Sequence, residues 1–189
     1  MNRPAIYGVS IVLACLGLSQ IAAAGYIHAK AIVAQHLIAS AWAQQKQGGV
    51  ARRPWPGADM RPVARLSVPR QGVELYVLDT SSARALAFGP AHVSGTALPG
   101  SWGNTVIVAH RDTHFAFLEK LAAGEEIDIE TSRGAARYRV DEITVVDRNE
   151  TRVLDPADSA QLTLITCYPF DAVRPGTTLR YVVIASRVA

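Results

Sequence analysis

The hydrophobic and polar positions follow three different patterns along this chain of 189 residues. Residues 4–27 are almost all apolar or small, and none is charged. From residue 61 onward, short apolar runs alternate with proline and glycine, a pattern that predicts short strands. Between them, residues 28–46 carry apolar side chains at steps of three and four, the spacing of one helix face: Ile32, Val33, Leu37, Ala41 and Trp42.

The first pattern predicts a membrane segment over residues 1–27. As a helix, the apolar run from Ile6 to Ile27 would be about 33 Å long, close to the thickness of the hydrocarbon core of a bilayer. Two alternatives stay open: a cleaved signal peptide ending near Ala22–Ala24, and a lipoprotein signal at Cys15. We favour an uncleaved single-pass anchor, because the run is too long for an ordinary signal peptide. Such an anchor lies in the inner or plasma membrane and leaves the rest of the chain exported, in a periplasmic or other extracytoplasmic location.

The helical spacing that begins at residue 28 predicts a helical stalk, followed by a linker, over residues 28–60. Gly48 and Gly49 end the helix, and the segment ARRPWPGADMRP (51–62) is rich in proline, which stiffens a linker. Residues 61–189 then form the folded domain that we expect to carry the activity.

The short apolar runs from residue 61 onward predict that this domain is mainly β, with one short helix at Phe115–Leu121. The segment RYRVDEITVV shows clear alternation of polar and apolar residues. Seven or eight short strands with so little helix indicate a closed barrel or a sandwich. The predicted strands are Val63–Val68, Val73–Leu78, Asn104–Ala109, Glu126–Thr131, Ala135–Val146, Leu162–Thr166 and Thr178–Ser186.

Charge and composition exclude several classes of function. Three of the 19 basic residues and none of the 16 acidic residues lie in residues 1–50, so residues 51–189 are balanced and have no basic field for nucleic acid. Apolar residues make up 49% and charged residues 19%, which argues against disorder.

The sequence motifs argue against a metal or nucleotide site. His110 and His114 lack the glutamate and the third ligand of a zinc site, and the chain has no nucleotide-binding loop. We therefore expect no metal and no cofactor.

Cys167 is the most informative candidate for chemistry. It follows the apolar run Leu162–Ile165 and precedes Tyr168–Pro169, so we expect it where a buried strand ends. With Cys15 in the membrane it would have no disulfide partner, and an unpaired thiol in an exported domain is a liability unless it has a role. A cysteine buried in the core is the alternative interpretation.

A reactive thiol needs a proton acceptor and a group that binds developing negative charge. His110 directly follows the apolar run NTVIVA, so it occupies the same kind of strand end as Cys167. Arg180 opens the apolar run LRYVVIA, and its planar guanidinium suits an oxyanion or a peptide carbonyl. Three other arginines compete for this role: Arg111, Arg174 and Arg187.

These residues resemble the motifs of the sortase family. TLITC (163–167) is similar to the sortase signature Thr-Leu-x-Thr-Cys, which a histidine precedes and an arginine follows. NTVIVAHRDTHF (104–115) and PGTTLRYVV (175–183) are similar to class D-like sortases of the Gram-negative, marine proteobacterial type. The resemblance extends from about Pro54 to Ser186.

The resemblance implies an eight-stranded sortase-type β-barrel with one or two short helices, preceded by the N-terminal transmembrane and stalk helix. It implies a cysteine transpeptidase that cleaves an LPxTG-like C-terminal sorting signal on an exported protein, through a thioester, and transfers the protein to an amine acceptor. Cys167 would be the nucleophile, His110 the general acid and base, and Arg180 the group that stabilises the tetrahedral intermediate. Thr166 would lie in the substrate cleft beside the thiol, and Asp147–Ala160 would be the specificity loop.

Two alternatives to this hypothesis stay open. A cysteine acyltransferase of the L,D-transpeptidase type would need a histidine-glycine-threonine segment and an arginine soon after the cysteine, which Cys167-Tyr168-Pro169 does not supply. A non-enzymatic, membrane-anchored β-domain that scaffolds envelope proteins would instead keep Cys167 in its core.

Overall fold

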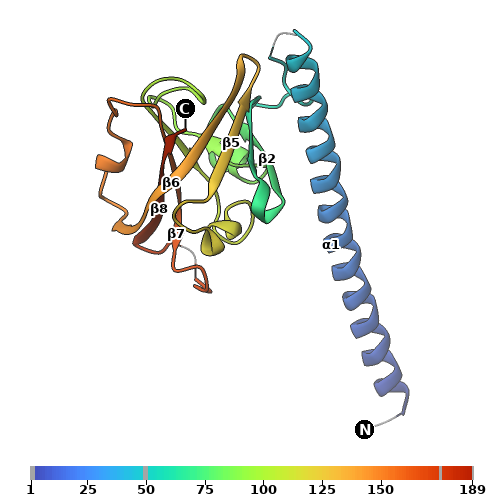
Figure 1. Cartoon of the computed structure of the whole chain (residues 1–189). Coiled ribbons are helices and arrows are strands. Elements are labelled where there is room, and N and C mark those ends of the chain that lie inside the picture. The colour runs from blue at the N-terminus through green and yellow to red at the C-terminus, as the bar shows by residue number, and fades with distance from the viewer. Residues whose placement is uncertain (1–2, 49–50, 175, 189) are drawn as a thin grey trace. The chain divides into compact units, whose positions relative to one another are not determined.

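The computed structural model of the protein describes residues 3–48, 51–174 and 176–188. The chain divides into two compact units, Met1–His36 and Leu37–Ala189. A long helix, α1 (Arg3–Lys46), begins in the first unit and ends in the second (Figure 1).

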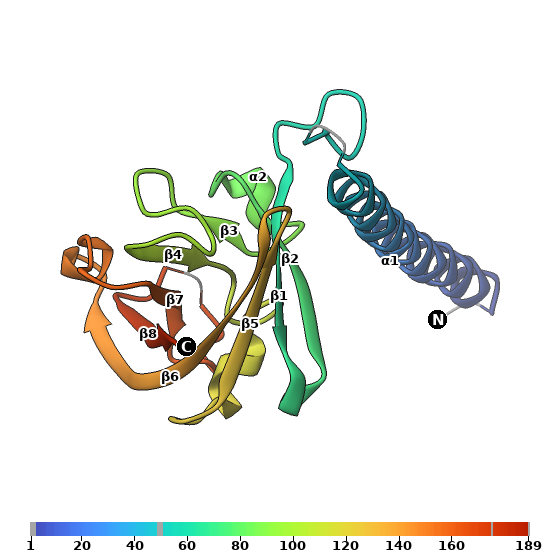
Figure 2. The same cartoon turned by 45° about the horizontal axis from the view of Figure 1, so that its top comes forward.

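The second unit contains a closed barrel of eight strands (Figures 1 and 2). Around the barrel the order is β1-β2-β3-β4-β7-β8-β6-β5, and β5 pairs with β1 to close it. Neighbours are antiparallel except for β2 with β3 and β4 with β7, which are parallel. The predicted closed, mainly β barrel is confirmed, and the sandwich is excluded. The strands are β1 (Pro62–Val68), β2 (Val73–Leu78), β3 (Ala91–His92), β4 (Asn104–Val108), β5 (Glu126–Thr131), β6 (Gly134–Asp147), β7 (Gln161–Tyr168) and β8 (Leu179–Arg187).

Short helices join several of these strands. The helix predicted at Phe115–Leu121 is a 3-10 helix, η2 (Ala116–Lys120). Gly72 follows η1 with a φ of 64°, a left-handed conformation that glycine adopts without strain, and the chain turns there into β2. The other short helices in the described part of the second unit are η1 (Pro69–Gln71), α2 (Ala83–Leu86) and η3 (Arg152–Leu154).

Alternation along the strands decides which side chains fill the barrel. In β6, Ala136, Tyr138 and Val140 are buried, whereas the residues between them are exposed. A slip of one residue would turn this whole set toward solvent, so burial fixes the register. Each large apolar side chain that is buried contributes about 1.5–3 kcal/mol. Other members of the same core include Leu66, Ile107, Ile129, Leu164 and Val183.

A second apolar cluster lies where the last turns of α1 pack on the barrel. Ile38 is fully buried there together with Leu78 and Met60. Trp55 packs edge-on against Phe88, with 5.2 Å between the ring centroids. The segment predicted as a stiff linker therefore forms part of the core.

The part of α1 that lies in the second unit buries one of its faces. Ile38, Ala41 and Trp42 are buried, whereas Leu37 is exposed, as are Ile32 and Val33 in the first unit. The structure confirms the helix over residues 28–46, and Ala41 and Trp42 are the residues of the predicted spacing that it buries in the second unit.

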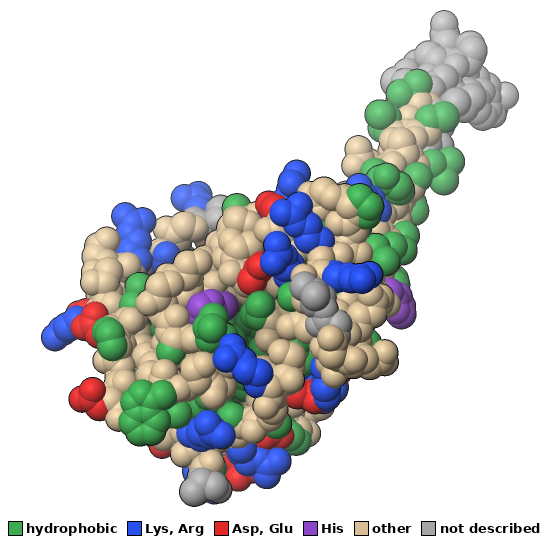
Figure 3. Space-filling model, turned by 90° about the horizontal axis from the view of Figure 1, so that it is seen from above, with side chains coloured by type: hydrophobic (Ala, Val, Ile, Leu, Met, Phe, Trp, Pro, Cys, Tyr) green, Lys and Arg blue, Asp and Glu red, His purple; other side chains and the backbone are tan. Residues whose placement is uncertain are grey.

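In the first unit, α1 carries exposed apolar side chains such as Val12, Leu16 and Ile21 (Figure 3). Within the described residues, no helix combines the length and the hydropathy needed to cross a bilayer. The anchor predicted over residues 1–27 is therefore not confirmed. Residues 1–2 and the side chains of residues 3–11, 14, 24, 27 and 28 lie outside the described part.

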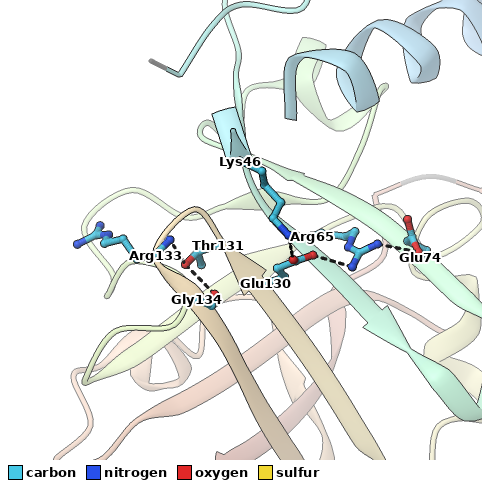
Figure 4. Close-up of polar contacts among 7 residues, drawn as sticks. All are labelled: Lys46, Arg65, Glu74, Glu130, Thr131, Arg133 and Gly134. Carbon is cyan, nitrogen blue, oxygen red and sulfur yellow. Dashed lines mark hydrogen bonds and ion pairs between the residues drawn. The ribbon is translucent and has the colours of Figure 1, made fainter. Parts of the chain in front are cut away.

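The outer face of β1 and β5 carries a row of paired charges (Figure 4). The Lys46 ammonium at the end of α1 contacts the Glu130 carboxylate. Arg65 binds the same carboxylate at 2.6 Å and reaches Glu74 at 3.2 Å. The hydrogen bond from Lys46, opposed by partial burial and helped by the charge of Arg65, lowers the pKa of Glu130. On this face, cations and carboxylates neutralise one another.

Candidate active site

Three neighbouring strands bring the predicted site residues together at one end of the barrel. The parallel pairing of β4 with β7 continues past the end of β4, because the Ala109 N–H donates to the Ile165 carbonyl at 3.3 Å. His110 comes next in the chain and so lies at the level of Cys167. On the other side of β7, Cys167 is directly paired with Arg180 of β8. The central cysteine thus has the histidine strand on one side and the arginine strand on the other.

The side chains of these three residues share the outer face of the barrel. Successive side chains of a strand point to opposite faces. Val106, Ile165 and Val182 lie four or two residues from them, on the same face, and form an apolar cluster outside the barrel core. Thiol, imidazole and guanidinium therefore stand at the end of an apolar floor, which is extended by Val93, Val108, Val146, Val153 and Ile184.

The thiol and the imidazole are both accessible. Cys167 is half-buried and free of any disulfide, and His110 is exposed. Cys167 belongs to the strand end rather than to the cluster that fills the barrel. A small molecule or an extended peptide at this end of the floor, where Val108 is only partly buried, can reach both groups.

Arg180 is held in place by one of its nitrogens. Its Nη1 donates to the Thr177 carbonyl at 2.8 Å and to the Leu179 carbonyl at 2.9 Å. Among the described residues, no acceptor engages Nε or Nη2. The guanidinium is thus anchored at one nitrogen and retains donors for a ligand.

Two of the competing arginines lie away from this arrangement. Arg187 is seven residues further along β8 than Arg180, about 24 Å at the rise of an antiparallel strand. Arg174 has an exposed side chain in the loop between β7 and β8. Neither matches the direct pairing of Arg180 with Cys167.

The third competitor, Arg111, binds the loop between β7 and β8. Its guanidinium donates to Thr177 Oγ1 at 3.2 Å and to the carbonyls of Ala172 and Arg174 at 2.6 Å and 3.2 Å. The carbonyl of Thr177 in turn accepts from Arg180. Arg111 therefore ties the end of β4 to the loop that holds Arg180. Its sequence position beside His110 gave no indication of this contact.

Thr166 has surroundings different from the open cleft that we expected. Its side chain is only 2% exposed, and its hydroxyl donates to the Ala109 carbonyl at 2.8 Å. Alternation explains this, since neighbours in a strand face opposite sides and Cys167 faces outward. Thr166 joins β4 to β7 directly beneath the thiol and the imidazole, so its contact is with the strands rather than with the apolar floor.

Asn104 is a buried polar residue that sequence analysis missed. Its Nδ2 donates to the carbonyls of Val153 and Asp155, at 3.1 Å and 3.0 Å. Its Oδ1 accepts from the Thr163 hydroxyl at 2.7 Å. These bonds attach the loop between β6 and β7, the predicted specificity loop, to the apolar floor. A polar residue that opens an otherwise apolar strand was the available sequence signal.

The other two histidines of the barrel unit, His114 and His92, are partly or fully buried. Burial lowers the pKa of His114 below its ordinary value, and the charge of His110 acts in the same direction. His92 is buried, with Nε2 2.9 Å from the Ala97 carbonyl. In the part of the chain that the structure describes, no three side chains of the types that ligate metals gather at one point.

Comparison with known proteins gives consistent matches. The sortase domain family model matches residues 66–188. Sortase D of Bacillus subtilis is 29% identical over 124 residues, which cover 65% of this chain and 62% of the relative. The structure of sortase A from Corynebacterium diphtheriae is 32% identical and superposes with a TM-score of 0.63, covering 70% of this chain and 63% of that one. The chain thus spans less than two thirds of the length of either relative.

A third likeness concerns the fold alone. The structure of a Clostridium perfringens sortase D5 transpeptidase is 24% identical, with a TM-score of 0.67, and covers 83% of this chain and 99% of that one. The eight-stranded barrel is thus the sortase fold. Because the family model matches well over half of the chain, the chain belongs to the sortase family.

Proposed function

We propose that this chain is a cysteine transpeptidase that cleaves an LPxTG-like C-terminal sorting signal and transfers the exported protein to an amine acceptor. Membership of the family supports the reaction type, since sortases are transpeptidases of the cell envelope that act on exported proteins bearing sorting signals. The observation that carries the proposal is the register that sets His110 and Arg180 on either side of Cys167.

In the first half of the reaction, the Cys167 thiolate attacks the carbonyl carbon of the Thr–Gly bond. The carbonyl oxygen gains negative charge, and the free N–H groups of Arg180 donate to it. The C–N bond then breaks, and protonated His110 gives its proton to the leaving amine. The product is a thioester between the signal's threonine and Cys167.

In the second half, the acceptor amine attacks the thioester carbonyl and loses a proton to His110. The C–S bond breaks, and the sulfur leaves as a thiolate, so the starting pair of charges is restored. Water can replace the amine, in which case the product is the free acid.

The apolar floor supports an extended peptide with apolar residues ahead of the cleaved bond. Val106, Ile165 and Val182 are buried, so the partly buried members of the floor, such as Val108, Val146 and Ile184, would contact such side chains. The loop between β6 and β7 borders the floor through Val153 and is attached to it by Asn104. We therefore assign the choice of motif to this loop.

A single-pass anchor at residues 1–27, with the barrel on the extracytoplasmic side, belongs to the same proposal. An anchored enzyme and an anchored substrate meet in two dimensions, which raises their effective concentration. The anchor is separable from the chemistry, which rests on residues of the barrel.

The test is to incubate the full chain with a library of LPxTG-like peptides and to read adducts on the intact protein by mass spectrometry. We expect a thioester on Cys167 with a subset of peptides, and its release by an added amine. Cys167→Ala removes the nucleophile and should lower cleavage at least about a thousandfold, whereas the matched change Cys15→Ser should not. Turnover retained by Cys167→Ala would contradict the proposal.

A further inference from the structure

A pocket of about 420 Å³ opens at the end of the barrel on the side away from the thiol. Tyr168 and Tyr181 line it, and each directly follows a proposed catalytic residue in its strand. Because neighbouring side chains face opposite sides, both rings point away from Cys167 and Arg180. Tyr181 packs against the barrel core, which agrees with this orientation. The pocket is therefore distinct from the apolar floor.

Three aromatic rings in mutual contact form one wall of the pocket. Phe170 and Tyr181 meet edge to face with 5.1 Å between ring centroids. Tyr168 lies 6.0 Å from Tyr181, nearly parallel to it, and 6.2 Å from Phe170. All three are only partly buried, so part of each ring faces the opening. The faces of aromatic rings carry negative potential and attract cations.

Two carboxylates lie beside these rings. Glu119 comes from η2, and Asp171 follows Phe170 in the chain. Among the described residues, neither has an ion-pair partner. Burial, the neighbouring Tyr168 and the charge of Glu119 together raise the pKa of Tyr181, which agrees with Glu119 lying close to that ring.

We propose that this pocket, lined by Tyr168, Phe170, Tyr181, Glu119 and Asp171, binds the alkylammonium side chain of a lysine on a partner polypeptide. The rings cover the aliphatic stem and attract the charge, and the carboxylates add Coulomb attraction. An anionic group would meet two uncompensated negative charges, so the pocket selects against it. The inference does not depend on the proposed reaction, because none of the lining residues takes part in it.

The test uses the full chain and two small probes that differ in one charged group. Nα-acetyl-lysine methylamide carries the ammonium, and Nα-acetyl-norleucine methylamide has a neutral aliphatic side chain. Titration is followed by NMR of ¹³C-labelled tyrosine and phenylalanine rings. We expect saturable shifts of Tyr168, Phe170 and Tyr181 with the lysine probe and none with the norleucine probe. Equal shifts with both probes, or no shift with either, would overturn the proposal.

Variants of the carboxylates test the electrostatic half of the site. Glu119→Gln combined with Asp171→Asn should weaken binding of the lysine probe about fivefold, and Phe170→Leu should weaken it by a similar factor. Glu142→Gln, an exposed carboxylate on β6, is the matched control and should bind as the parent does. Unchanged affinity in the double variant would contradict the assignment. Repeating the titration in Cys167→Ala keeps this result separate from the fate of the proposed reaction, since the pocket should bind equally well there.

Discussion

Two outer faces of the same barrel differ in whether their charged side chains have ion-pair partners. On β1 and β5 every charged side chain has an ion-pair partner: Glu130 pairs with Arg65 and with Lys46 of α1, Asp128 with Arg137 at 2.7 Å, and Glu126 with Arg137 and Arg139. On β4, β7 and β8 the floor is apolar, and at its end lie a thiol, an imidazole and a guanidinium with free donors.

The difference separates a structural surface from the surface that carries the proposed catalytic residues. Exposed ion pairs contribute about 0–1 kcal/mol each, so the paired face adds little to stability and offers no unpaired group for chemistry. The apolar face instead leaves its polar groups available to a ligand. Changes to the polar groups at the end of the apolar floor should therefore alter activity with the fold retained. Changes on the paired face should lower stability slightly and leave activity unchanged.

Among the variants that test the difference between the two faces, we expect the largest change in activity at Arg180. In Arg180→Lys the ammonium cannot both hold the loop carbonyls and donate to the oxyanion, so kcat/KM for a cleaved peptide should fall about a hundredfold. Arg187→Lys, on the same strand but at its far end, is the control and should keep its activity. Equal activity of the two variants would remove Arg180 from the mechanism.

A smaller effect is expected at Arg111. Arg111→Ala frees the loop that positions Arg180, so kcat/KM should fall about tenfold while thermal stability changes little. Hydrogen exchange should accelerate at Ala172 and Thr177, whose groups Arg111 binds. Arg174→Ala, whose side chain is exposed in the same loop, serves as the reference. Full activity with a loosened loop would show that the loop does not position the guanidinium.

On the paired face, Glu130→Gln should lower the free energy of unfolding by about 1 kcal/mol and leave kcat/KM unchanged. The pKa of Glu130 is lowered in the folded state, so its contribution is present above the ordinary value of 4.5 and is lost as pH falls through the folded value. Urea unfolding at pH 7 and in the acid range measures the loss of unfolding free energy and its dependence on pH. Loss of activity in this variant would break the distinction between the two faces.

The smallest effect concerns His114, which is partly buried. Its folded pKa lies below the ordinary value of 6.5, so the unfolded chain takes up the proton first as pH falls. Stability should therefore decline as pH drops below about 6.5, and His114→Gln should flatten that part of the profile. An unchanged slope would assign the pH dependence to other groups.

Much of the barrel followed from the sequence, because alternation marks a strand with one buried face. β2 and β5 have the predicted bounds, and the other long strands differ by one or two residues. The strand β3 was missed, since two residues are too few to show a period.

The positions of Cys167 and His110 were predictable, because each follows an apolar run whose strand ends at the same edge of the barrel. Because side chains alternate along a strand, an outward Cys167 implies that the Thr166 side chain points inward, where its hydroxyl binds the Ala109 carbonyl. The bonds of Arg111 to the β7–β8 loop and the meeting of Glu119 with Tyr181 depend on tertiary packing of distant segments. No local pattern carries that information.

The most direct measurement compares alkylation of Cys167 by iodoacetamide in Cys15→Ser and in Cys15→Ser/His110→Ala, with intact-protein mass spectrometry across pH 5–9. If the imidazole withdraws the proton of the neighbouring thiol, labelling near neutral pH should be several-fold slower without His110, and the profile should shift toward that of a free thiol. Identical profiles in the two proteins, or a Cys167 that resists the reagent in both, would contradict a reactive centre at this barrel end.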